Sequence, residues 1–85
     1  MKPQRSTDPE VSALARRLPS DEAWVIVAYF GPKAGKSPGL RSLVASTSFK
    51  AANLPRQIAL DMPDSFDTCT LVGWSDGVNP GELGF

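Results

Sequence analysis

Apolar positions near the start of the chain repeat with the period of an α-helix. Val11, Leu14 and Leu18 are spaced three and four residues apart, so they share one face of a helix. An Asp-Pro dipeptide at residues 8–9 comes just before them. A capping carboxylate followed by proline at the first helical position is typical of a helix start. The pattern therefore predicts a helix over residues 8–18.

The next pattern is a continuous apolar run. Residues 23–30 (AWVIVAYF) are apolar at every position and rich in β-branched and aromatic side chains. Such a run is typical of a strand that is buried on both faces, so we expect it at the centre of a sheet. Residues 31–39 follow with three glycines and two prolines, which predicts a long loop.

Residues 40–49 (LRSLVASTSF) fit two patterns. Leu43, Thr47 and Phe49 belong to an alternating set typical of a strand, and the serines, threonine and valine of the segment are poor helix formers. We therefore expect a strand that forms a hairpin with residues 23–30. A second helix beginning at the Ser-Pro dipeptide of residues 37–38 is the alternative.

Two further strands are predicted in the second half of the chain. Residues 50–56 contain asparagine and proline, which indicates a turn or a single helical turn. In residues 57–62 (QIALDM) apolar side chains alternate with others, as in a half-buried strand. Residues 68–74 (TCTLVGW) have strand composition, and residues 63–65 between the two have turn chemistry. We expect a second hairpin here.

Together these elements predict a small α+β fold. One N-terminal helix would pack on an antiparallel sheet of about four strands. A chain of 85 residues is long enough for one domain only, so residues 8–85 form that domain and residues 1–7 a mobile N-terminal arm.

Composition excludes several classes of chemistry. The chain has no histidine, so histidine-based catalytic triads and histidine metal sites are excluded. Cys69 is the only cysteine, which rules out an internal disulfide and a thiolate cluster, and its place in an apolar strand predicts a core position. No stretch has the length of a membrane span or the pattern of a secretory signal, so we expect a soluble cytoplasmic protein.

Two motifs come close to known sites without matching them. Residues 31–37 (GPKAGKS) resemble the phosphate-binding loop of nucleotide hydrolases, but the spacing between the glycines is one residue short. Asp61, Asp64 and Asp67 recur at every third position, which is not the spacing of a calcium-binding loop. The sequence therefore predicts no enzyme activity, no cofactor and no metal.

Charge is distributed unevenly along the chain. Nine basic and nine acidic residues cancel, yet all charged residues between 31 and 56 are basic and all those from 57 to 85 are acidic. Such separation suggests two surfaces of opposite potential. The alternative is that the charges pair with one another across the sheet. The basic set is Lys33, Lys36, Arg41, Lys50 and Arg56, and the acidic set is Asp61, Asp64, Asp67, Asp76 and Glu82.

These observations predict a small non-enzymatic protein of bacterial or phage type that binds a larger protein or nucleoprotein partner, as an inhibitor or adaptor. Charge would steer the encounter and apolar residues would supply most of the affinity. The expected contact residues are Asp61, Asp64, Asp67 and Asp76 on the acidic side, Lys33, Lys36 and Arg41 on the basic side, and Trp74 as an apolar anchor.

Two other functions fit the same pattern. The basic residues between 31 and 56 could bind a nucleic-acid backbone, in which case affinity would fall steeply with salt. Complementary charged ends could instead join copies of the chain in a self-assembling complex. An acidic hairpin that imitates nucleic acid would be a special case of the inhibitor.

Overall fold

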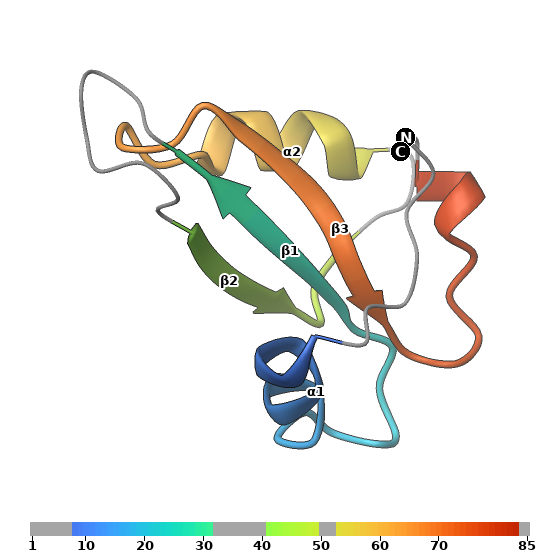
Figure 1. The fold of residues 1–85 in the computed structure, drawn as a ribbon. Helices are drawn as coiled ribbons and strands as arrows, with labels where there is room; N and C mark the ends of the chain where they lie inside the picture. Colours follow the sequence, from blue (N-terminus) through green and yellow to red (C-terminus); the bar gives the residue numbers. More distant parts are fainter. Residues whose placement is uncertain (1–7, 32–40, 50–52, 84–85) are drawn as a thin grey trace.

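The protein is a three-stranded antiparallel sheet with a helix on each face, as a computed structural model shows (Figure 1). The structure describes residues 8–31, 41–49 and 53–83. In chain order the elements are α1 (Pro9–Ala15), β1 (Val25–Phe30), β2 (Arg41–Ser46), α2 (Leu54–Asp61), β3 (Thr68–Trp74) and a 3-10 helix (Pro80–Leu83). The predicted α+β class is confirmed.

Strand β1 lies between the other two strands, in the order β2-β1-β3, and pairs antiparallel with both. Its residues 25–29 are all buried, because each face of the sheet is covered. The predicted central strand and the hairpin that it forms with β2 are therefore confirmed. The β1–β2 register is regular throughout, whereas the β1–β3 register shifts between Ile26 and Val27, which leaves Val72 as an extra residue in a β-bulge.

The main core lies between the sheet and α2. Alternate residues of β1 point to this side, where they meet Leu54 and Ile58 of the helix. Phe66 closes one end, and its ring lies 6.2 Å from that of Tyr29 at an interplanar angle of 53°. The buried members are Val25, Val27, Tyr29, Leu54, Ile58, Phe66, Leu71 and Leu83.

Helix α1 covers the opposite face. Ile26 and Ala28 of β1 point to this side and are fully buried, and Val11 of α1 is buried next to Gly73 of β3. The predicted cap is present, since Asp8 Oδ1 accepts a hydrogen bond of 2.8 Å from the backbone N–H of Glu10. The helix ends at Ala15, earlier than predicted.

The prediction of a strand over residues 57–62 is wrong, because these residues belong to α2 and its C-cap. Leu54, Ile58 and Met62 recur at every fourth position and face the core, while Leu60 is 73% exposed. The second hairpin is wrong as well, since β3 pairs with β1. The fold therefore has three strands and two α-helices in its described part, and not about four strands and one helix.

Candidate functional site

The predicted acidic contact residues fall into two groups. Asp61 is the last residue of α2, and Asp64 and Asp67 are on the segment that joins α2 to β3; all three are exposed. Trp74 is the last residue of β3 and Asp76 lies just beyond it, at the other end of the strand and about 20 Å away for a strand of this length. The structure therefore places three of the predicted carboxylates near one end of β3 and the fourth near the other end. Lys33 and Lys36 lie outside the described residues.

Arg41 is held within the molecule. Its guanidinium donates to Asp8 Oδ2 at 2.7 Å and to Glu10 Oε2 at 2.6 Å, so the start of β2 is tied to the first turn of α1. These bonds lower the pKa of Asp8 and raise the pKa of Arg41. The charge of Arg41 is thus shared with two carboxylates, and its contact with a partner stays a prediction.

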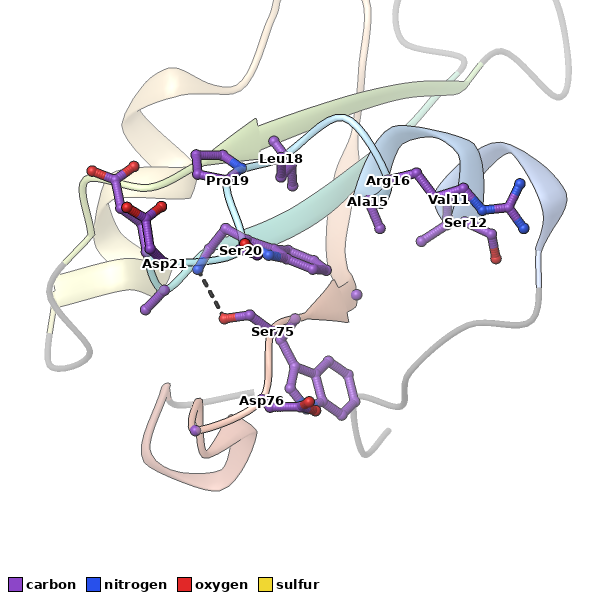
Figure 2. Close-up of a pocket in the computed structure, with 16 residues that line it drawn as sticks. Val11, Ser12, Ala15, Arg16, Leu18, Pro19, Ser20, Asp21, Ser75 and Asp76 are labelled. Atoms are coloured by element: carbon purple, nitrogen blue, oxygen red, sulfur yellow. Dashed lines mark hydrogen bonds between the residues drawn. The ribbon is translucent and has the colours of Figure 1, made fainter.

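One hollow lies between α1, the segment that follows it and the end of β3 (Figure 2). Its volume is about 810 Å³, and Arg16 and Asp21 lie at its opposite ends. The segment is fixed to the sheet because the N–H of Trp24 donates to Ser75 Oγ at 3.0 Å and the N–H of Ser75 donates to the carbonyl of Trp24 at 3.1 Å. Trp74, the predicted anchor, lines this hollow.

A second hollow, which we call the β2–α2 groove, runs between β2 and α2 over the surface of β1. Its volume is about 310 Å³. The floor is apolar and the rims are mixed, because β2 contributes serines and Val44, and α2 contributes Gln57 and Asp61. Val44 of β2 is 46% exposed on this rim, beside an apolar floor formed by Val25, Val27 and Tyr29.

The groove has two chemically different ends. Asp61 lies at the end where β1 finishes, and its Oδ2 accepts a hydrogen bond of 2.9 Å from Gln57 Nε2. Burial raises the pKa of Tyr29 on the floor, with smaller contributions from Cys69 and Asp61. The opposite end is lined by Phe49 and Asn53, near the start of α2.

Strand β2 forms one edge of the sheet, and in its described part it lacks the devices that usually protect an edge. Strand β3, at the other edge, carries the bulge at Val72. Strand β2 has a regular register and no proline, and residues 42–46 carry no charge. Its outer side has no strand partner among residues 8–31, 41–49 and 53–83.

The described residues do not assemble a centre for metal chemistry or thiol catalysis. Within the described segments no group of three or more acidic or cysteine side chains could hold a metal ion. Burial raises the pKa of the Cys69 thiol, which keeps it protonated and weakly nucleophilic. Neither α-helix of the described segments has the length or apolar character needed to cross a bilayer.

Comparison with protein-family models, with curated proteins and with solved structures finds no match to this chain. The β2–α2 groove does not follow from the predicted elements, because the strand predicted over residues 57–62 stands where α2 forms one wall of the groove. The signal that could have found it is the recurrence of Leu54, Ile58 and Met62 at every fourth residue, with Asn53 just before the first of them and Pro55 in the first turn, where helices often carry a proline.

Proposed function

We propose that this protein is a non-enzymatic binding protein that docks on a larger protein partner, and that β2 is its contact strand, which binds the partner through its outer side. The observation that carries the proposal is the combination of a regular edge strand, uncharged over residues 42–46, with an apolar groove beside it. An extended segment that pairs with β2 would extend the sheet by one strand. The absence of histidine from the chain supports a function without catalysis.

Strand addition uses the two parts of the site differently. Main-chain hydrogen bonds to an edge strand give affinity for any extended segment, and pockets that receive alternate side chains give specificity. Ser42, Val44 and Ser46 point to the face of the sheet that carries the groove, because their pairing partners in β1 are Tyr29, Val27 and Val25. Every second side chain of a segment paired with the outer side of β2 would therefore project from this same face, beside the groove.

The carboxylates at the turn between α2 and β3 add a long-range contribution. Asp61, Asp64 and Asp67 are exposed, and the described residues of that turn include no basic side chain. Such a local field speeds the encounter with a basic partner more than it tightens the final complex. This is the part of the predicted charge separation that supports docking at the groove.

The test uses peptides selected from a random twelve-residue phage-display library on the immobilised protein. We expect Val44→Lys to weaken the binding of selected peptides by about tenfold or more, because it adds a charge to the apolar rim of the contact strand. Leu60→Lys is the matched control: it adds the same charge on the exposed face of α2 and should leave the dissociation constant within about twofold.

Two results would contradict the proposal. If the library yields no binding peptide, or if the two lysine variants weaken binding equally, β2 is not a contact strand for a protein segment. Dimerisation of the free protein that Val44→Lys abolishes, measured by analytical ultracentrifugation, would show that β2 pairs with a second copy of the chain instead of a partner.

A further inference from the structure

Among the residues that the structure describes, one charged group lines the β2–α2 groove, and this makes the two ends of the groove unequal. Among the described lining residues Asp61 is the single ionisable carboxylate, and none is lysine or arginine. The bond from Gln57 Nε2 holds the Asp61 carboxylate on the groove side of the C-terminal end of α2. Asp64 and Asp67 follow just beyond it and carry the same charge.

The direction of an added strand follows from the sheet. Both existing pairings are antiparallel, and antiparallel pairs are slightly more stable per residue than parallel ones. A strand that pairs antiparallel with β2 runs in the same direction as β1, from the end of the groove near Phe49 to the end near Asp61. The C-terminal part of the segment therefore reaches Asp61.

The register then places side chains beside specific parts of the groove. A residue opposite Val44 lies next to this exposed apolar side chain, and the residue two positions later lies opposite Ser42, which in turn pairs with Tyr29 of β1. These two side chains project to the same face, about 7 Å apart. An apolar side chain suits the first position, and a cationic side chain long enough to reach Asp61 suits the second.

Resting on the proposed function, we infer that the β2–α2 groove selects an extended protein segment in which an apolar residue is followed, two positions later, by lysine or arginine. The segment pairs antiparallel with β2, and its cationic side chain bonds to Asp61. The occupant is thus a basic-apolar segment of another protein, and the acidic end of the groove fixes its direction and register.

The experiment compares peptide selections on the wild-type protein and on Asp61→Lys. We expect peptides selected on the wild-type protein to be enriched in the pattern apolar-any-Lys/Arg. Peptides selected on Asp61→Lys should carry aspartate or glutamate in place of the Lys/Arg of this pattern. Asp61→Lys should weaken the wild-type peptides by about five- to tenfold, and replacing their basic residue by glutamate should restore binding to the variant.

Asp64→Lys is the matched control, because it makes the same charge change on an exposed residue that does not line the groove. It should reduce affinity by less than about threefold. Folding of Asp61→Lys is checked by thermal melting, and lysine suits this site because a helix C-terminus favours a cation. Asp61→Asn, which keeps the shape of the side chain, serves as a second variant.

The inference is overturned if selected peptides show no basic enrichment, or if Asp61→Lys and Asp64→Lys weaken binding to the same extent. Sensitivity to Val44→Lys would in that case still support strand addition, so failure of the charge rule is distinguishable from failure of the proposed function. Basic peptides that retain their affinity for Val44→Lys but lose it for Asp61→Lys would overturn both.

Discussion

Gly73 lies at the closest approach of α1 to the sheet. A Cβ at this position would lie 3.0 Å from Val11 Cγ1, which is closer than such atoms normally pack, and 3.5 Å from Ile26 Cδ1, which is an ordinary contact. Glycine at this position therefore serves packing, because the absence of a side chain lets α1 approach β3 closely. Gly77 is different: its φ of 91° is a conformation that favours glycine.

We predict that Gly73→Ala destabilises the protein by about 1–3 kcal/mol, because the added methyl group overpacks the contact with Val11. The free energy of unfolding in urea measures this. Val11→Ala removes the clashing atoms, so in that background Gly73→Ala should cost clearly less. Equal costs in the two backgrounds would show that Val11 is not the cause.

Single residues also show how far sequence reasoning extends. The cap at Asp8 could be predicted because its partner is two residues away along the chain. The second role of Asp8, as a partner of Arg41, could not, because that contact joins residues 33 positions apart and depends on how α1 crosses the sheet. Local patterns identify local bonds, and long-range pairs require the tertiary arrangement.

At the scale of elements, α2 provides the clearest test of the structure. A strand would place Ile58 and Leu60 on the same face, whereas in the helix Ile58 is only 4% exposed and Leu60 is 73% exposed. The two side chains are similar in size, so the difference in their contribution to stability depends on their surroundings.

We predict that Ile58→Ala lowers the free energy of unfolding by about 2–4 kcal/mol, because it leaves a cavity in the core. Leu60→Ala should change it by less than about 0.5 kcal/mol. Chemical denaturation followed by circular dichroism provides both values. Similar losses for the two variants would favour the strand that the sequence suggests.

Most elements could be predicted from the chain, and the failure at residues 57–62 has a physical reason. Ile58, Leu60 and Met62 alternate, as in a half-buried strand, but every fourth residue of the same segment is apolar as well. A short segment cannot decide between the two periods. The pairing of β3 with β1 also escaped prediction, because neighbouring strands in sequence often pair, and here a helix intervenes.

At the scale of the whole molecule, the ion pairs of Arg41 connect two elements that lie far apart in the sequence. They link the first turn of α1 to the start of β2, so they hold the helix against an edge of the sheet. Folding thus reduces the separation of charge that the sequence suggests. Arg41, from the basic middle segment, pairs with Asp8 and Glu10, which come before that segment in the chain.

We predict that Arg41→Gln lowers the melting temperature by a few degrees at neutral pH. The folded-state pKa of Asp8 lies below its ordinary value of 3.8, so the stabilisation is complete above that value and is lost as the pH falls through the lower one. The difference between wild type and variant should therefore shrink below pH 3.8. Melting curves at several pH values test this, and a difference that is constant down to pH 2 would exclude an ionic origin.

The candidate site likewise has a part that the sequence predicts and a part that it does not. The exposed carboxylates near the end of α2 could be identified as a group from their spacing in the chain. The groove that makes one of them distinctive could not, because it requires a helix beside an edge strand.

The position of β1 between two strands that follow it in the chain has a consequence for synthesis on the ribosome. Hairpin partners that are close in sequence meet early, so β1 and β2 can associate before Thr68–Trp74 has emerged. During that interval the second side of β1 has exposed amide and carbonyl groups among strongly apolar residues. Until β3 is added, this open side of β1 is therefore a surface on which the folding chain can aggregate.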